Sequence, residues 1–306
     1  MSICEDKDVY YKKGFFNIDE SFVAECERRF EGELCEKVAE LCRKKESRII
    51  GLTGPTCSGK TTAAKKLISY LGDVQKRVVT VSLDDFFKDN YTREMLKDRD
   101  VSKLDFDSPD TFDNALFEGF IDELFKCGRA KKPIFDFVTG TRAVWETVEC
   151  DNDDILLLEG IQVLYPAVLS IIEKYDGSVM AVIAESGIEI DGRLFEPNFI
   201  RFCRRLVRDY HFRKSGPELT FPMWSNVSRN EKLNILPHMG RCDVIIDTTL
   251  AYELNMLAPH VRKILGEVES DRTYYSDAQS ILEVFDGIVG IESDCLSENS
   301  LYKEFV

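Results

Sequence analysis

The stretch that most restricts the fold of this chain is the octapeptide GPTCSGKT at 54–61. It matches G-x-x-x-x-G-K-[ST] at every position, a pattern whose glycines let main-chain N–H groups close around phosphate oxygens. An apolar run at 49–52 precedes it, and apolar residues at helical spacing follow it over 63–71. A strand, a loop and a helix in this order point the positive end of the helix dipole at a polyphosphate. The residues predicted to form this nucleotide-binding loop are Gly54, Pro55, Thr56, Cys57, Ser58, Gly59, Lys60, Thr61 and Thr62.

Two side chains of the loop carry specific chemistry. Lys60 supplies a mobile positive charge for the terminal phosphates, and the Thr61 hydroxyl is placed to ligate Mg²⁺. We therefore expect ATP and Mg²⁺ as cofactors.

Acidic residues follow two further apolar runs. The run 77–83 ends in Asp84 and Asp85, and the run 154–158 ends in Glu159. The carboxyl ends of parallel strands face the ligand in an open α/β sheet. A carboxylate there could orient and deprotonate a substrate hydroxyl or hold Mg²⁺, although Asp84 or Asp85 could instead cap a helical turn. We favour Asp84 as the functional residue and Glu159 as the Walker-B carboxylate, so that Thr61, Asp84 and Glu159 form the predicted metal site.

A cluster of basic residues lies in the segment RFCRRLVRDYHFRK at 201–214. Its arginines at 201, 204, 205 and 208 follow helical spacing and share one face. Such a stripe is usually a solvated surface. Beside a phosphate loop, however, guanidinium groups on a closing lid can neutralise the charge of a transferring phosphoryl group. We therefore expect catalytic or ATP-clamping roles for Arg204 and Arg208.

The order of apolar segments predicts an α/β fold. Short strands separated by helices indicate a doubly wound, mainly parallel sheet flanked by helices. The residues 108–110, with sequence SPD, are expected to open a helix whose buried face runs over 112–125. The segments 134–138 and 144–148 predict a hairpin, and the charged stretch 88–105 predicts a loop or a short lid.

The composition of the chain limits the classes of partner that it can bind. The net charge of −15 argues against a nucleic acid or an anionic membrane as partner. The ten cysteines form no C-x-x-C pair, and no secretory signal is evident at the start, so reduced thiols in the cytoplasm are expected. The most apolar stretch, 155–172, is interrupted by Glu159, Gln162 and Pro166, which excludes a membrane span there. A small-molecule partner is expected, and self-association is left open.

Taken together, these motifs resemble the uridine kinase and phosphoribulokinase group of P-loop kinases. The matching segments are GPTCSGKT (54–61), SLDDFFK (82–88), FDSPDTFD (106–113), FDFVTGTR (135–142), LLLEGI (156–161) and RFCRRLVRD (201–209). They occur in the order of the family and span 48–250. The resemblance implies a P-loop NTPase fold with a substrate hairpin and an arginine-rich lid. Apolar residues at helical spacing over 22–41 predict an N-terminal helical extension at 1–47. We expect a kinase domain at 48–255 and a C-terminal helical extension and tail at 256–306.

The resemblance also implies roles for individual residues. Asp84 would face the 5′-hydroxyl of a nucleoside, and Glu159 would lie on the Mg²⁺ side. Asp107 would hold the ribose hydroxyls. Typical uridine–cytidine kinases have Tyr and His around the base, whereas this chain has Phe135 and Gly140. The residues implied on the substrate side are Asp84, Asp107, Phe135, Phe137, Arg142 and Arg201, and the catalytic set is Asp84, Lys60, Arg204 and Arg208.

The implied activity is transfer of the γ-phosphate of ATP to a nucleoside such as uridine or cytidine, in pyrimidine salvage. Two alternatives stay open. The acceptor could be a sugar phosphate or pantothenate, or the chain could bind nucleotide as a regulatory protein without transferring phosphate.

Overall fold

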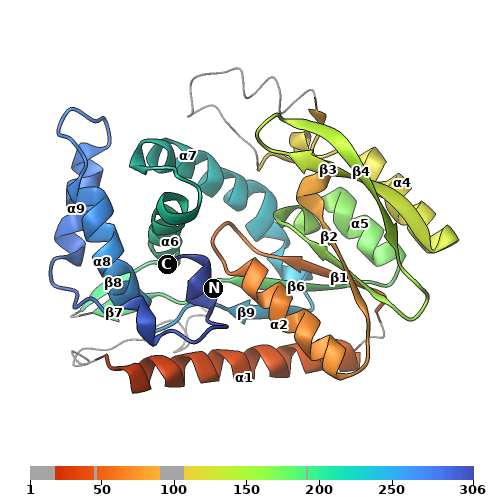
Figure 1. The fold of residues 1–306 in the computed structure, drawn as a ribbon, viewed down its shortest axis with the longest axis horizontal. Helices are drawn as coiled ribbons and strands as arrows, with labels where there is room; N and C mark the ends of the chain where they lie inside the picture. Colours follow the sequence, from red (N-terminus) through yellow and green to blue (C-terminus); the bar gives the residue numbers. More distant parts are fainter. Residues whose placement is uncertain (1–17, 45–46, 90–106, 191) are drawn as a thin grey trace.

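The structure, a computed structural model, describes residues 18–44, 47–89, 107–190 and 192–306. Nearly all of the predicted lid at 88–105 lies outside these residues. At the centre is a five-stranded sheet in the order β2-β5-β1-β6-β9, in which every neighbouring pair is parallel (Figure 1). The prediction of a doubly wound parallel sheet is therefore confirmed. Its strands are β1 (Ile49–Thr53), β2 (Val78–Ser82), β5 (Ile155–Glu159), β6 (Ser178–Ile183) and β9 (Val244–Asp247).

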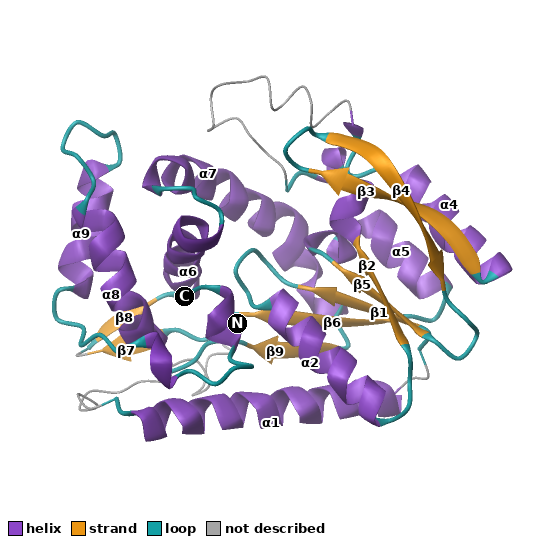
Figure 2. Cartoon of the chain, viewed as in Figure 1, coloured by secondary structure: helices purple, strands orange, loops and turns teal. Residues whose placement is uncertain are grey.

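Both faces of the sheet are buried because apolar side chains occupy successive positions of its strands. On β1, Ile50 and Leu52 belong to one apolar cluster and Ile49 belongs to a second. Strands that are apolar on both faces are typical of parallel sheets covered by helices, and Figure 2 shows helices on either side. The first cluster includes side chains of α1 (Glu20–Lys44), α2 (Lys60–Asp73), α6 (Pro197–Phe212) and α8 (Glu253–Gly266), and the second includes those of α4 (Asn114–Cys127) and α5 (Pro166–Lys174).

The remaining elements lie around this core. Two antiparallel pairs, β3 (Arg129–Asp136) with β4 (Thr141–Glu149) and β7 (Ile188–Ile190) with β8 (Arg193–Phe195), stand apart from the main sheet. The first pair is the predicted hairpin. Its strands are longer than the predicted segments 134–138 and 144–148, since pairing extends to Arg129 and Glu149. Two further α-helices are α7 (Pro217–Asn230) and α9 (Tyr275–Phe285). Short helical turns are η1 (Leu83–Phe86), η3 (Pro109–Thr111), η4 (Ile161–Leu164), η5 (Glu231–Ile235), η6 (Leu236–Arg241), η7 (Ser293–Cys295) and η8 (Leu301–Glu304).

The helix before the hairpin begins later than the sequence predicts. Ser108 caps only the short turn η3, where its Oγ accepts a hydrogen bond from the Asp110 amide at 3.3 Å. Phe112 is extended because it forms an isolated antiparallel bridge with Phe87. Asp113 is the true cap of α4, since its Oδ1 accepts from the Leu116 amide at 3.1 Å. The expected opening of this helix at 108–110 is therefore wrong.

A buried ion pair joins α6 to α8. Arg204 donates to both carboxylate oxygens of Glu253, at 2.7 and 3.0 Å, and neither side chain is exposed. Arg204 also donates to the main-chain oxygens of Thr248 at 2.7 Å and Cys57 at 3.2 Å. The guanidinium thus connects the phosphate loop to two elements far away in the sequence.

This pair predicts a large effect of one substitution on stability. Glu253→Gln removes the negative charge and leaves the Arg204 guanidinium buried without a counter-ion, so the free energy of unfolding is expected to fall by about 3–5 kcal/mol. Urea unfolding followed by circular dichroism measures the change. The matched control is Glu25→Gln, which breaks an exposed pair with Arg28 and is expected to cost less than about 1 kcal/mol. Equal losses in the two variants would contradict the structural role of the buried pair.

Candidate active site

The phosphate loop connects the end of β1 to the first turn of α2. Gly54 has φ +155° and Gly59 has φ +88°. A Cβ at Gly54 would overlap the main-chain oxygen of Val182, and one at Gly59 would overlap the side chain of Leu301. The two glycines are therefore required both by backbone conformation and by close packing. The helix that follows begins at Lys60, so its free N–H groups are directed at the loop.

Lys60 lies folded against the loop. Its Nζ donates to the main-chain oxygens of Gly54 at 2.8 Å and Pro55 at 3.0 Å. Burial lowers the pKa of Lys60, and the carboxylates of Glu304, Glu159 and Asp84 oppose this effect.

The two predicted carboxylates meet at one edge of the sheet. β2 and β5 are neighbours, with Ser82 opposite Glu159, and Asp84 follows two residues after Ser82. Gln162, from the turn η4 after β5, donates from Nε2 to Asp84 Oδ1 at 2.7 Å. Burial raises the pKa of both Asp84 and Glu159, while the Lys60 ammonium acts in the opposite direction on each.

The structure separates Asp84 from its neighbour Asp85. The Asp85 carboxylate accepts hydrogen bonds from Lys132 Nζ at 2.6 Å and from the Phe135 amide at 3.1 Å. Both donors belong to β3, so Asp85 ties the hairpin to the strand end. Asp84 is the member of the pair that lines a cavity together with Lys60 of the phosphate loop.

A cavity of about 630 Å³ lies between the loop, the strand ends and α6. It brings together many of the predicted residues from six different segments. The predicted residues that line it are Thr56, Cys57, Lys60, Thr61, Asp84, Asp107, Phe137, Glu159 and Arg208. Further lining residues that the sequence did not single out include Arg205, Arg213, Met223, Asn226 and Glu304.

Three arginines reach this cavity, and one carboxylate holds all three. Asp209 accepts from Arg205 Nε at 3.1 Å and from Arg208 Nη2 at 3.0 Å, and it lies 3.6 Å from Arg213 Nε. The Asp209 side chain is itself buried. The guanidinium groups of Arg205 and Arg208 are thus fixed in direction, and all three arginines bring positive charge to the cavity.

Arg201 and Arg204 do not line the cavity. Arg201 forms a two-pronged pair with Glu231 at 2.7 and 2.6 Å, and Arg204 pairs with Glu253 beneath the phosphate loop. Helical spacing predicts that several arginines lie close together on α6. Which of these arginines line the cavity depends on the elements that pack against α6.

Two predicted substrate residues, Phe135 and Arg142, do not line the cavity. Phe135 is buried, with its ring centroid 5.0 Å from that of Phe137 and 5.5 Å from that of Phe87. Arg142 pairs with Asp113 at 3.0 Å and donates to Asp89 at 3.3 Å. Of the hairpin residues, Phe137 is the one that borders the cavity, and 53% of its surface is exposed.

The oxygen groups of the cavity fit Mg²⁺. Thr61 offers a hydroxyl, and Asp84 and Glu159 offer carboxylates. Within the described residues, no group of three or more His, Cys, Asp and Glu side chains could hold a metal by itself. Mg²⁺ does not need one, since it retains waters and is usually bound by one or two carboxylates together with substrate phosphates.

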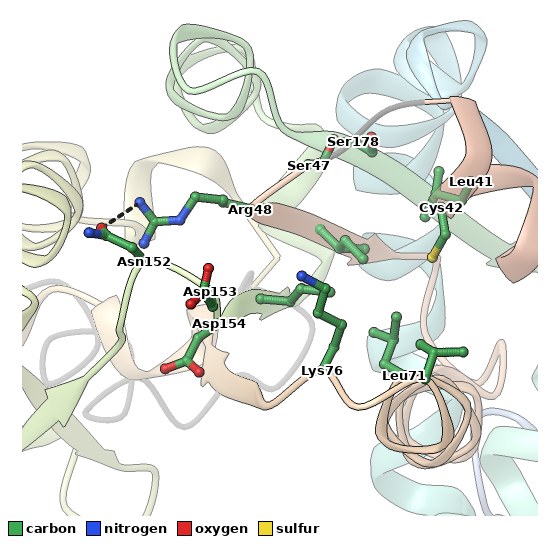
Figure 3. A pocket seen from close by; sticks show the side chains of 13 residues that line it. Leu41, Cys42, Ser47, Arg48, Leu71, Lys76, Asn152, Asp153, Asp154 and Ser178 are labelled. Atoms are coloured by element: carbon green, nitrogen blue, oxygen red, sulfur yellow. Dashed lines mark hydrogen bonds between the residues drawn. The ribbon is translucent and has the colours of Figure 1, made fainter.

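A separate cavity lies at the other end of the sheet. It has a volume of about 520 Å³ and includes Ile50, Ile155 and Ser178 from the amino ends of three strands. Figure 3 shows Arg48 at its edge, donating to Asn152 Oδ1 at 3.3 Å. Because the phosphate loop follows the carboxyl end of β1, this cavity belongs to a different part of the molecule.

A parallel sheet with a phosphate loop and acidic strand ends at one cavity is the arrangement of P-loop nucleotide-binding proteins. The chain belongs to the Phosphoribulokinase / Uridine kinase family, whose family model matches residues 49–253. This result confirms the resemblance stated from the motifs.

Relatives with assigned names are similar over most of the chain. A uridine kinase of Lactobacillus johnsonii is 28% identical over 238 residues, which cover 74% of this chain and 100% of that protein. A uridine-cytidine kinase A of Dictyostelium discoideum is 30% identical over 228 residues, covering 73% of this chain and 41% of that protein. Among solved structures, a possible uridine kinase from Bacillus stearothermophilus is 18% identical with a TM-score of 0.43, covering 70% of this chain and 100% of that chain. In the part of the chain that the structure describes, no helix has the length and apolar character needed to cross a membrane.

Asp107 predicts a pH-dependent effect on stability. Burial raises its pKa from 3.8 to about 6. Because the pKa of Asp107 is higher in the folded than in the unfolded chain, folding favours the protonated carboxyl. The contribution of Asp107 to stability is therefore full below pH 3.8 and is lost as the pH rises through about 6. Asp107→Asn should therefore raise the free energy of unfolding at pH 8, by about 1 kcal/mol once partial exposure is allowed for.

Urea unfolding at pH 4 and pH 8 tests this. The difference between Asp107→Asn and the native chain should nearly vanish at pH 4. Asp110→Asn is the control, because that side chain is exposed and the substitution should change little at either pH. A variant at residue 107 that is less stable than the native chain at pH 8 would refute the prediction.

Proposed function

We propose that this chain is an ATP-dependent kinase that phosphorylates a small-molecule hydroxyl, namely the 5′-hydroxyl of a nucleoside. The observation that carries the proposal is the single cavity in which Asp84, Lys60 and Arg208 line the same space. A phosphate site, a carboxylate for the acceptor and cations for the transition state are the parts that phosphoryl transfer needs.

In this mechanism Asp84 acts on the acceptor hydroxyl. Its carboxylate accepts the hydrogen bond of the hydroxyl and then its proton, and Gln162 holds the carboxylate in place at 2.7 Å. Because the transition state is loose, proton removal is late and a strong base is unnecessary. Thr61, Asp84 and Glu159 would hold Mg²⁺, which neutralises charge on the phosphates.

The cations that line the cavity stabilise the transferring group. We assign this role to Lys60 and to Arg205, Arg208 and Arg213, the three arginines that Asp209 orients. Charges that are fixed before the reaction cost no reorganisation when the transition state forms. In this proposal Arg204 and Arg201 do not contact the substrates. Arg204 holds the phosphate loop in position and pairs with Glu253, and Arg201 pairs with Glu231.

A nucleoside acceptor is supported by the aromatic wall and by the named relatives. The exposed ring of Phe137 offers a face for stacking on a base, and Asp107 lies in the same cavity, where it could accept hydrogen bonds from ribose hydroxyls. The relatives in this family include proteins named uridine kinase and uridine-cytidine kinase.

The experiment that tests the function is an ADP-release assay with Mg²⁺–ATP and a panel of acceptors. Ribonucleosides are expected to stimulate ADP release, with the 5′-phosphate as product. If only sugar phosphates or pantothenate stimulate ADP release, the proposed acceptor is wrong, and the protein is a kinase for one of those compounds. ATP binding without stimulation by any acceptor would instead favour a regulatory nucleotide-binding protein.

Asp84→Asn separates catalysis from nucleotide binding. Turnover is expected to fall by about 10²–10⁴-fold, because the amide cannot take the proton, while the Kd for ATP stays close to that of the native chain. Turnover is measured by ADP release and binding by calorimetry. Asp153→Asn, an exposed carboxylate at the opposite end of the sheet, serves as the control. Native-like turnover of Asp84→Asn would be fatal to the assignment.

Lys60→Ala tests the phosphate side of the site. Its effect should be independent of the acceptor, because Lys60 acts on the phosphates that every acceptor shares. The rate is expected to fall by roughly the same factor, on the order of 10²-fold or more, with each acceptor used. Lys65→Ala, an exposed lysine of the same helix, is expected to keep the native rates. A loss confined to one acceptor would argue that Lys60 binds the acceptor instead.

A further inference from the structure

The segment 297–306 packs directly against the phosphate loop. Leu301, Tyr302 and Phe305 are almost wholly buried, with at most 1% of each side chain exposed. Leu301 fills the space beside Gly59, where a Cβ would overlap it. Figure 1 shows this dark blue end of the chain near α6 and α2. A stretch far from the nucleotide-binding motif in sequence therefore forms part of its wall.

Several contacts hold this segment in one position. Tyr302 donates from its hydroxyl to Glu253, and the Arg204 guanidinium lies 5.5 Å from the Tyr302 ring centroid and 5.4 Å from that of Phe305. The Ser297 amide donates to Glu27 of α1 at 3.3 Å. Because the neighbouring side chains of this segment are packed and hydrogen-bonded, the fold determines where the Glu304 side chain lies.

Glu304 extends from this segment into the proposed nucleotide site. Its Oε2 accepts a hydrogen bond from Thr62 Oγ1 at 3.3 Å, and its side chain lines the same cavity as Lys60 and Thr61. Among the carboxylates that oppose the effect of burial on the pKa of Lys60, Glu304 acts most strongly. It also acts to raise the pKa of Arg208. A negative charge of the chain itself thus lies among the cations that a polyphosphate would contact.

We infer that Glu304 is an internal anion of the phosphate site, whose negative charge an incoming polyphosphate meets beside Lys60 and Arg208 in the same cavity. A carboxylate and a phosphate use the same donors, and like charges at short range repel each other. Glu304 therefore weakens the binding of nucleotide polyphosphates and sets the concentration at which the site fills. The inference rests on the proposed function, because it takes the cavity to be a polyphosphate site.

The sign of the effect distinguishes this role from two others. If Glu304 instead held a metal ion for the nucleotide, its removal would weaken binding. If it served only to fix the loop through Thr62, removal of its charge would leave binding unchanged or weaken it. A gain in affinity is specific to a competing anion.

The experiment measures the binding of inorganic tripolyphosphate to the full chain by calorimetry, without added divalent metal. Glu304→Gln keeps the shape of the side chain and removes its charge, so we expect binding about tenfold tighter than in the native chain. Glu304→Lys should bind more tightly still, whereas Glu304→Asp should bind as the native chain does. Circular dichroism and thermal unfolding of each variant check that the fold is kept.

Glu298 provides matched controls. It is an exposed acid of the same segment and does not line the cavity with Lys60. Glu298→Gln and Glu298→Lys change the net charge by the same amounts and are expected to alter binding less than about twofold, since exposed charges are screened.

The possible outcomes distinguish a failure of the inference about Glu304 from a failure of the proposed kinase function. Unchanged or weaker binding by both Glu304→Gln and Glu304→Lys, with tripolyphosphate bound by the native chain, overturns the inference alone. Equal gains in the residue-298 variants also overturn it, because the effect would then be one of net charge. Failure of the native chain and of every variant to bind tripolyphosphate and Mg²⁺–ATP overturns the proposed function and this inference together.

Discussion

The parallel alignment of β1, β2 and β5 determines where chemistry can occur in this protein. These strands are neighbours in the sheet, with Leu52 and Ser82 on either side of Glu159. Since parallel strands end on the same side, the loop after β1, the turn after β2 and the acid of β5 meet at one edge. The alignment is maintained by apolar side chains on both faces, each covered by its own group of helices. The cavity is therefore a consequence of how the core is packed.

Opposite charges are concentrated around that cavity, and several of them are held by a partner. Gln162 fixes Asp84, and Asp209 fixes the arginines at 205, 208 and 213. Burial of unpaired charge is costly, so such partners are what make a desolvated charged site stable. The same partners decide the directions in which the charges point. The cost of orienting these charged groups is in this way included in the free energy of folding.

Helix α6 serves both the core and the site. Near its amino end Arg201 and Arg204 form buried pairs with Glu231 and Glu253, which connect the helix to the loop and to α8. Further along the same helix Arg208 lines the cavity, together with Arg205. The segment 297–306 packs on the same Glu253–Arg204 pair through Tyr302. Loop, α6, α8 and the end of the chain thus form one connected unit around the proposed nucleotide site.

Local patterns in the sequence were enough to determine the phosphate loop, the acids at the strand ends, the parallel sheet and the hairpin, because each depends on the order and spacing of nearby residues. The start of α4 after its cap Asp113 was not predictable, since Phe112 is held extended by its bridge to Phe87. Which arginines reach the cavity, and the presence of Glu304 there, were decided by tertiary structure alone. Thr62 and Glu304 are 242 positions apart, and helical spacing does not reveal that Glu253 will pair with Arg204. Such contacts depend on which distant surfaces pack together, and that is a property of the whole core.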